Sequence, residues 1–177
     1  MPPKRIIFIR HAEKPDSGNG DRGVAPDGSA DDESLTIRGW QRAGALTLFF
    51  STRSEIKPSV IFASGIGHDS KSKRPIETVT ALAGQIHPAP LITTHLRDDL
   101  HPLMEEVSTR NGTVLVCWEH KRIPALVGLL PGPPAIPKDW PDDRFDVLWI
   151  FDRTDDGWSF SQMPQLLLPG DSARPIV

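Results

Sequence analysis

The chain has 177 residues, 38% of them hydrophobic and 24% charged, which suggests one folded domain over residues 1–177. Its net charge of -3 gives no general attraction to nucleic acid or to an anionic membrane, and no apolar run could cross a bilayer or form the core of a signal peptide. The single cysteine, Cys117, excludes an intrachain disulfide and a thiolate zinc cluster. We therefore expect a soluble, cytoplasmic protein with no nucleic-acid or membrane partner, and the sequence leaves the oligomeric state open.

The first half of the chain alternates buried strands with loops and helices. Residues 5–9 form a continuous apolar run, which is typical of a strand buried on both faces. Residues 15–34 are rich in Gly, Ser and Asp and predict a long acidic loop. Thr36 is a plausible N-cap for the helix that follows. A second buried strand is expected at 60–63 and a basic loop at 64–73.

The second half continues the alternation. Its expected elements are a helix from Pro75, a short strand at 91–96, a helix at 100–108, a strand at 113–118, a helix from Pro124 to Leu130, a loop at 131–141, and a hairpin of strands 145–151 and 158–163. Asp155, Asp156 and Gly157 are expected at the turn of that hairpin. The pattern predicts an α/β fold, in which a mostly parallel central sheet carries helices on both faces and the C-terminal hairpin adds antiparallel strands.

Polar side chains follow three of the predicted strands. Arg10 and His11 end the first strand, and Ser64 follows the second. His120 follows the central strand, and Arg74 lies one loop beyond Ser64. Because ligands of such sheets bind at the carboxyl ends of the strands, we expect these side chains to share one edge. Guanidinium groups match a phosphate dianion, and a neutral imidazole between them can act as a nucleophile. A single Arg-His pair at a strand end is more often solvated than functional. The expected placement of Arg10, His11, Arg74 and His120 at one edge of the sheet is what favours a phosphate site.

Four segments, in order, resemble the histidine phosphatase superfamily, the phosphoglycerate-mutase-like proteins. They are FIRHAEK, LTIRGWQRAGAL, SKRPIETVTALA and TVLVCWEHKRIPALV, and the closing FDVLWIF and PQLLLPGD resemble the tail of small bacterial-type members. The resemblance covers nearly the whole chain. It implies an enzyme of that fold which needs no metal and no other cofactor.

The resemblance also implies a role for each polar side chain at the strand ends. His11 would accept the phosphoryl group, Arg10 and Arg74 would hold its oxygens, and His120 would complete the pocket. The implied reaction moves a phosphoryl group from a small phosphorylated substrate, or from a phosphoprotein such as a phosphohistidine protein, to His11 and then to water. A phosphosugar mutase and a non-catalytic phosphate-binding module are the alternatives.

Two positions depart from the family pattern near the expected site. Ser64 and Arg74 are further apart than in the family, so the 64–73 loop could read the substrate or be a solvated insertion. Glu119 stands where the family commonly has Gly, and its carboxylate could orient a neighbouring base or face solvent. We expect Ser64 and Glu119 to contact substrate. Glu13, directly after the signature, is expected there too, with an exposed ion pair as the alternative.

The third departure concerns the acid that protonates the leaving oxygen. Many members carry a glutamate in a Leu-x-Glu context, and the matching segment here reads Leu96-Arg97-Asp98. Asp98 is therefore the predicted proton donor, and Asp99, Glu13 or a residue of the 15–34 loop are the alternatives. Some members that act on phosphohistidine manage without a strong acid, because their leaving group is already good.

Overall fold

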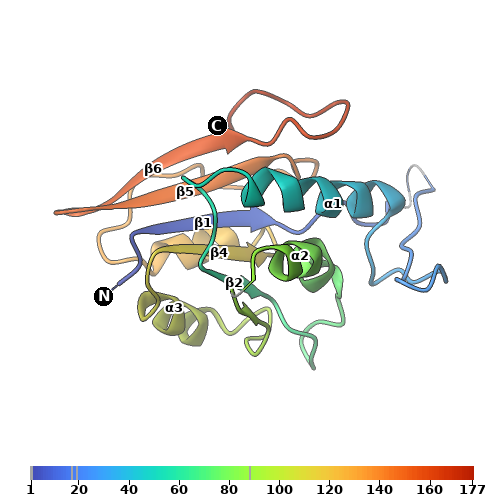
Figure 1. Cartoon of the computed structure of the whole chain (residues 1–177), viewed down its shortest axis with the longest axis horizontal. Helices are drawn as coiled ribbons and strands as arrows, with labels where there is room; N and C mark the ends of the chain where they lie inside the picture. The colour runs from blue at the N-terminus through green and yellow to red at the C-terminus, as the bar shows by residue number, and fades with distance from the viewer. Residues whose placement is uncertain (1, 17, 19, 88) are drawn as a thin grey trace.

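The computed structural model describes residues 2–16, 18, 20–87 and 89–177 (Figure 1). Its elements are β1 (Arg5–Arg10), α1 (Ile37–Ser51), β2 (Val60–Ala63), α2 (Arg74–Gln85), β3 (Leu91–Ile92), α3 (Leu100–Ser108), β4 (Thr113–Trp118), α4 (Ile123–Gly128), β5 (Val147–Thr154) and β6 (Gly157–Pro164). In these described ranges, no helix combines the length and apolar character needed to cross a membrane.

The strands form one six-stranded sheet in the order β3-β2-β4-β1-β5-β6. β3, β2, β4 and β1 are parallel, whereas β5 pairs antiparallel with β1 and β6 pairs antiparallel with β5. The predicted α/β fold with an antiparallel C-terminal hairpin is thus confirmed. β1 has a parallel neighbour on one side and an antiparallel neighbour on the other, so the end of β4 and the start of β5 both lie beside its carboxyl end.

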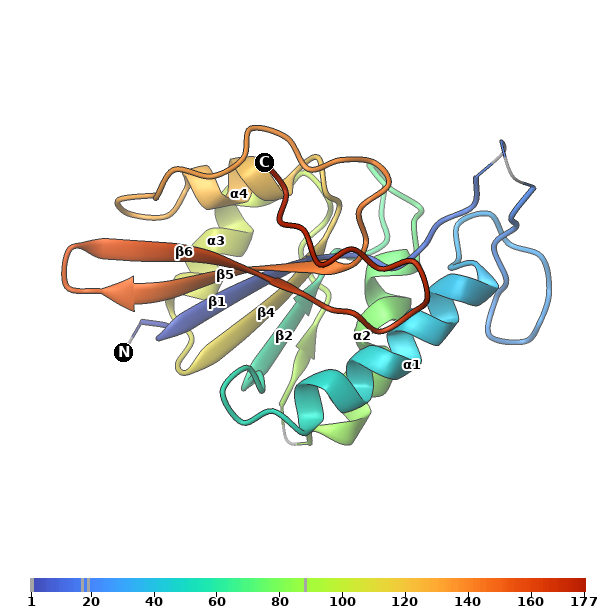
Figure 2. The same cartoon turned by 90° about the horizontal axis from the view of Figure 1, so that it is seen from above.

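Helices cover both faces of the sheet. Figure 2 shows α1 and α2 on one side and α3 and α4 on the other. Side chains of β1 alternate between the two cores, because successive residues of a strand point to opposite faces. Ile6 and Phe8 pack with residues of α3 and α4. Ile7 and Ile9 pack with residues of α1 and α2, which explains the uninterrupted apolar run of this strand.

Local signals set several element boundaries. The Thr36 hydroxyl accepts a hydrogen bond from the Gly39 amide (3.1 Å), which confirms Thr36 as the N-cap of α1. Pro75 occupies the first turn of α2, where its missing N–H costs nothing. In the hairpin, Thr154 pairs with Gly157 across the expected turn, and both strands are longer than predicted.

The strand predicted at 91–96 is shorter in the structure. Only Leu91 and Ile92 pair with β2, opposite Ile61 and Phe62. Beyond this point the backbone continues as a loop, in which the Gly65 amide donates to the His95 carbonyl (2.8 Å). A side chain at Gly65 would clash with this neighbouring backbone, since a Cβ there would lie 2.3 Å from the Thr93 carbonyl oxygen.

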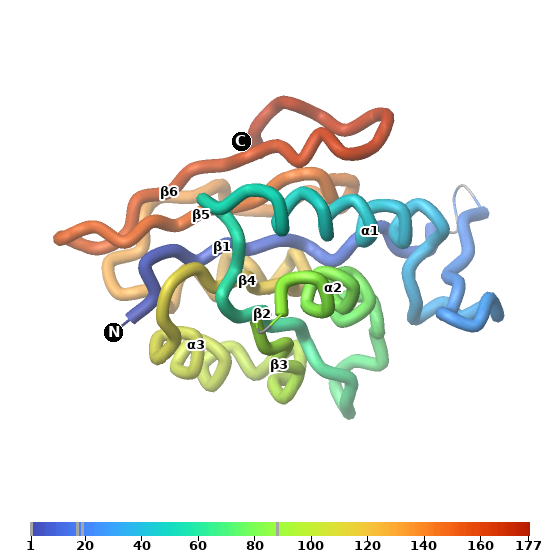
Figure 3. The backbone as a smooth tube through the Cα atoms, in the orientation of Figure 1, coloured from blue at the N-terminus to red at the C-terminus, as the bar shows by residue number. Residues whose placement is uncertain are grey.

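The 15–34 loop extends past the carboxyl ends of the parallel strands, next to the start of α1 (Figure 3). Isolated β-bridges join Gly23 to Thr36 and Val24 to Ala30. The Trp40 indole also donates to the Val24 carbonyl (2.7 Å). Backbone and side-chain hydrogen bonds, rather than an apolar core, therefore attach this loop to α1.

Candidate active site

The carboxyl ends of β1 and β4 lie side by side. Arg10 pairs with Trp118, and the hydrogen-bond ladder extends one residue further because the His11 amide donates to the Trp118 carbonyl (3.2 Å). His120, two residues past Trp118, reaches the same edge of the sheet. Ser64 follows β2, whose last residue pairs with the residue before Trp118. The topology thus brings these predicted site residues to one edge.

His11 is buried and its ring is fixed in one tautomer. Nδ1 lies 2.8 Å from the Ala12 carbonyl oxygen. Because a carbonyl can only accept, Nδ1 carries the hydrogen and Nε2 carries the lone pair. Burial, followed by the positive charge of Arg10, holds the pKa of His11 well below its usual value. The ring is therefore neutral near pH 7 and its Nε2 can act as a nucleophile.

Thr78 of α2 fixes the peptide that holds His11. Its hydroxyl accepts from the Ala12 amide (2.9 Å) and donates to the Arg74 carbonyl (2.7 Å). Thr78 is fully buried. One hydroxyl therefore links the residue after His11 to the first turn of α2, where Arg74 lies.

Arg10 lies against the segment that precedes β5. Its Nη1 donates to the Asp142 carbonyl (2.6 Å), with the carbonyls of Pro141 and Arg144 at 3.3 Å, and its guanidinium stacks 3.7 Å from the centre of the Phe145 ring. Burial lowers the pKa of Arg10 to about 10 despite nearby carboxylates, so it stays charged at neutral pH. Within the described part of the chain, its Nε and Nη2 are buried and have no hydrogen-bond partner.

Arg74 and His120 also present buried nitrogens. Arg74 Nη1 donates to the Asp32 carbonyl (2.7 Å), whereas its Nε has no partner among the residues described. Burial lowers the pKa of Arg74. His120 Nε2 lies 2.6 Å from Asp142 Oδ1, and no described residue bonds to its Nδ1. Burial, then the charge of Arg10, lowers the pKa of His120 to about 4 and outweighs the opposing effect of Asp142, so the ring is neutral at pH 7.

A cavity of about 120 Å³ lies between these groups. Five of the predicted site residues line it, namely His11, Ser64, Arg74, Glu119 and His120. Arg10 does not line it, although its charge acts on both histidines. The sequence did not single out Lys14, Ser70, Ser72, Pro75 and Arg97 as lining residues. Lys14 is three residues after His11 in the sequence, which could have indicated that it lines the site. No sequence pattern indicated Arg97.

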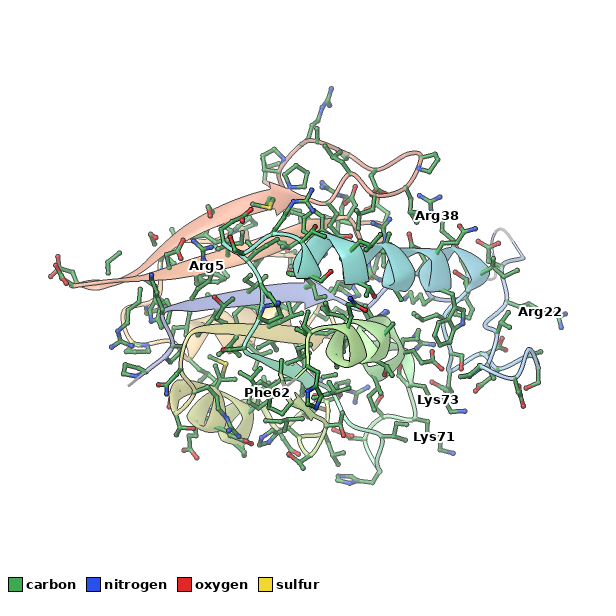
Figure 4. The ribbon with its side chains drawn as sticks, in the orientation of Figure 1. Arg5, Arg22, Arg38, Phe62, Lys71 and Lys73 are labelled. Carbon is green, nitrogen blue, oxygen red and sulfur yellow. The ribbon has the colours of Figure 1, made fainter. Side chains whose placement is uncertain are left out.

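The 64–73 loop contributes hydroxyl groups to the cavity. Ser70 and Ser72 line it, whereas the two lysines of the loop do not. Lys73 pairs with Asp31 (2.5 Å) and Lys71 is exposed. Figure 4 shows both lysine side chains pointing outward at the end of the molecule that carries the 15–34 loop. Any contact of this loop with a ligand in the cavity would thus be made by serine.

Glu13 does not line this cavity and is part of an ion-pair network instead. Its carboxylate bonds to Arg42 (2.8 Å) and Arg38 (3.2 Å), as in the alternative prediction of an ion pair. That alternative expected an exposed ion pair, whereas Arg42 is buried. Glu13 faces a second, larger cavity of about 640 Å³ with many acidic side chains. Lys14 lines both cavities, so the two are neighbours.

Asp98, the predicted acid, is not among the residues that line the cavity. Its carboxylate pairs with Arg97 (2.9 Å) and Arg122 (2.7 Å) and is 41% exposed. The hydrogen bond from Arg97 lowers the pKa of Asp98, so it has no proton to donate near pH 7. Asp99, the first alternative, accepts from the Leu96 amide (2.9 Å). Among the described residues that line the cavity, Glu119 is the only carboxylate.

No group of three or more His, Cys, Asp or Glu side chains within the described ranges could hold a metal ion. The titratable groups among the described residues that line the cavity are two neutral histidines, two arginines and a lysine, together with the single carboxylate of Glu119. This arrangement suits an anion that accepts hydrogen bonds, and phosphate is the common anion with that chemistry.

The sequence matches no protein-family model, and no curated protein matches it either. Solved structures with the same fold are nevertheless similar over most of their length. A phosphoserine phosphatase mutant from Entamoeba histolytica, in complex with phosphoserine, superposes with a TM-score of 0.59 at 15% identity, over 93% of this chain and 98% of that one. A protein from Agrobacterium tumefaciens assigned as the phosphohistidine phosphatase SixA gives 0.52 at 17% identity, over 90% and 95% of the two chains.

A third similar structure comes from Escherichia coli and is assigned as an alpha-ribazole-5'-P phosphatase. Its TM-score is 0.50 at 15% identity, with 89% of this chain and 94% of that chain covered. These structures belong to the histidine phosphatase superfamily. The chain therefore has the histidine phosphatase fold, in agreement with the resemblance seen in its sequence.

Proposed function

We propose that this protein is a phosphatase that hydrolyses phosphomonoesters or phosphohistidine through a phosphohistidine intermediate on His11. The observation that carries the proposal is the hydrogen bond between His11 Nδ1 and the Ala12 carbonyl. It leaves the Nε2 lone pair on a neutral ring, and the lowered pKa keeps that lone pair available at neutral and mildly acidic pH. The phosphatases that share the fold support the same reaction class.

In the first proposed step, His11 Nε2 attacks phosphorus. The N–P bond forms, the bond from phosphorus to the leaving oxygen breaks, and that oxygen takes a proton. Arg74, which lines the cavity and has a buried Nε without a partner in the described residues, would donate to the phosphoryl oxygens. The charge of Arg10, which lies behind the lining, would help to balance their charge, because arginine stays cationic at neutral pH. Electrostatic stabilisation by such fixed donors is usually the largest contribution to catalysis.

In the second step, water attacks phosphorus, the P–N bond breaks, and its electron pair returns to Nε2. The proton that the water loses passes to the Glu119 carboxylate where Glu119 gave up a proton in the first step, and otherwise to the phosphate that forms. His120, which lines the same cavity, is suited to stabilise the transferring oxygens through its Nδ1 once that nitrogen carries a proton. Glu119 is suited to protonate the leaving oxygen when the leaving group is poor, since it supplies the carboxylate in the cavity lining. The proposed chemistry uses no metal.

The proposal is tested by incubating the protein with para-nitrophenyl phosphate and with a panel of phosphoamino acids, sugar phosphates and nucleotides, between pH 5 and 8 with a chelator present. We expect release of phosphate and, after a rapid quench, a phosphoprotein that is labile in acid and stable in base. His11→Ala should abolish both. His101→Ala, a change of an exposed histidine on α3, is the matched control and should retain both.

Two outcomes would contradict the proposal. Turnover by His11→Ala would remove the phosphohistidine mechanism. Phosphate binding without turnover of any substrate would favour a non-catalytic phosphate-binding module. A phosphosugar mutase would be recognised by an isomeric sugar phosphate that forms faster than free phosphate.

A further inference from the structure

Asp142 contacts two of the basic side chains near His11, namely Arg10 and His120. Its backbone carbonyl accepts from Arg10 Nη1 (2.6 Å), and its Oδ1 lies 2.6 Å from His120 Nε2. Asp142 belongs to the irregular segment before β5, far from either partner in sequence. It also lines the larger cavity, so the Asp142–His120 pair lies where the two cavities meet.

The segment that carries Asp142 is held in place by packing. The Trp140 indole donates to the Arg144 carbonyl (2.8 Å), and its ring lies 4.8 Å from that of Trp149 in β5. The Phe145 ring supports the Arg10 guanidinium from one face. The backbone of Asp142 therefore has a fixed position relative to β1 and β5, and its carboxylate is held at His120 by that backbone.

The hydrogen bond determines which nitrogen of His120 carries the proton. A carboxylate can only accept, so Nε2 is protonated, and the neutral ring has its lone pair on Nδ1. Nδ1 is buried and has no partner in the part of the chain described. A lone pair cannot donate to a phosphoryl oxygen, so His120 must gain a proton on Nδ1 to stabilise such an oxygen.

The charges around His120 favour this gain of a proton only when an anion is present. The charged or titratable groups that face it are Arg10, His11, Lys14 and Asp142. Arg74, Arg97 and Glu119 line the same cavity, and Lys121 lies 4.0 Å from the Asp142 carboxylate. Asp142 and Glu119 are the carboxylates in this set. A phosphoryl dianion would offset the surrounding cations, and Asp142 would then stabilise the imidazolium directly.

We propose that Asp142 is a positioning residue that fixes the tautomer of His120 and supports its protonation when a phosphoryl group occupies the cavity. The inference rests on the proposed phosphatase function. Asp142 acts through His120 and not on the substrate. It gives the loop before β5 a part in the reaction that no sequence motif indicated.

The kinetic test compares Asp142→Ala, Asp142→Asn and Asp142→Glu with the wild type on para-nitrophenyl phosphate. Each variant keeps the carbonyl that binds Arg10, so the comparison isolates the carboxylate. For Asp142→Ala we expect kcat to fall by about 10- to 100-fold, by analogy with the range known for carboxylates that orient metal-binding histidines. Asp142→Glu should recover part of this loss. Asp139→Asn, on the same loop and exposed, makes the same charge change as Asp142→Asn and should leave kcat unaltered.

The pH profile separates a role in protonation from a merely structural role. Removing the negative charge lowers the pKa of His120 in the complex, so its protonated form is lost at lower pH. The alkaline limb of kcat should move to lower pH by about 1 unit in Asp142→Asn, at the small end of the usual effect because the carboxylate is exposed. A profile that matches those of the wild type and of Asp139→Asn would overturn the proposal.

A measurement without turnover tests the same inference independently. Long-range ¹H–¹⁵N spectra of the wild type should show His120 protonated on Nε2 at pH 7, and His120→Asn assigns the signal. Asp142→Ala should give a mixture of tautomers. A wild-type ring protonated on Nδ1 would overturn the proposal, even if the enzyme were active. If the protein released no phosphate from any substrate, the phosphatase function would fail, whereas these spectra would still decide the Asp142–His120 relationship.

Discussion

Arg42 and Asp171 form a two-point ion pair in the protein interior. The Nη2–Oδ1 distance is 2.7 Å and the Nη1–Oδ2 distance is 3.1 Å. Only 2% of the Arg42 side chain and 3% of the Asp171 side chain are exposed. Arg42 also binds Glu13, which follows the Arg10-His11 signature, so this pair joins the C-terminal segment to the residues beside the candidate active site.

Removing the arginine should destabilise the protein strongly. Arg42→Gln leaves Asp171 and Glu13 without their buried cation, and the loss of one partner from a buried ion pair costs about 3–5 kcal/mol. We expect a decrease of this size in the free energy of unfolding, measured by urea denaturation. Arg22→Gln is the control, since Arg22 points away from the body of the molecule (Figure 4). A loss below about 1 kcal/mol would show that the network contributes as little as a surface ion pair.

The same pair predicts how stability depends on pH. Burial opposes the ionised form of Asp171, but hydrogen bonds from Arg42 and from the amides of Leu168 and Leu167 outweigh it, and the pKa is lowered. A lowered pKa means that the stabilisation is complete above the unfolded-state value of about 3.9 and is lost as the pH falls through the folded-state value. The difference in unfolding free energy between the wild type and Asp171→Asn should therefore be constant from pH 7 to 5 and shrink below about pH 4. A constant difference down to pH 3 would contradict this linkage.

Thr78 should affect stability and activity together. Thr78→Val removes the acceptor of the buried Ala12 amide, and an unpaired buried donor costs about 1–3 kcal/mol. The same change frees the peptide whose carbonyl fixes His11, so kcat should fall as well. Thr78→Ser keeps the hydroxyl and should recover most of the lost stability and most of the lost kcat. Equal kcat values for the Val and Ser variants would show that the hydroxyl does not influence His11.

The effect of replacing Glu119 on kcat/KM should depend on the leaving group of the substrate. If it protonates the leaving oxygen, Glu119→Gln should lower kcat/KM for phosphoserine by about 100-fold or more, the usual contribution of a general acid. para-Nitrophenyl phosphate, whose leaving group needs little protonation, should be nearly unaffected. Asp98→Asn is the comparison, and we expect little effect of it on either substrate because Asp98 is paired and exposed. A uniform loss for both substrates would instead give Glu119 a role in binding.

The sequence predicted the parts of the fold and site that depend on local patterns. The apolar runs that precede Arg10 and His120 predicted two buried strands. Because ligands of parallel sheets bind at the carboxyl ends of the strands, His11 and His120 were then expected at one edge. Thr36 and Pro75 marked helix starts through their own chemistry.

The remaining features depend on distant contacts, which a local pattern does not contain. Asp142 lies in an irregular loop, and only the packing around it brings its carboxylate to His120. The predicted contact of Glu13 with substrate did not account for Arg42 on the next helix. Asp98 had the right neighbours in sequence, but its side chain turns toward two arginines, because sequence position alone does not determine the direction of a side chain in a loop.

The position of β1 between β4 and β5 has a consequence for the nascent chain. Arg10 and the Asp142 carbonyl that binds it are 132 residues apart. At ordinary rates of synthesis, about 5–20 residues per second, the ribosome needs about 7 to 26 seconds to make the intervening chain. Throughout this interval the edge of β1 that will pair with β5 lacks its partner strand, and an unpaired edge is prone to aggregation. Protection of this edge by β5 and the contact of the Asp142 carbonyl with Arg10 therefore both wait for the last part of the chain.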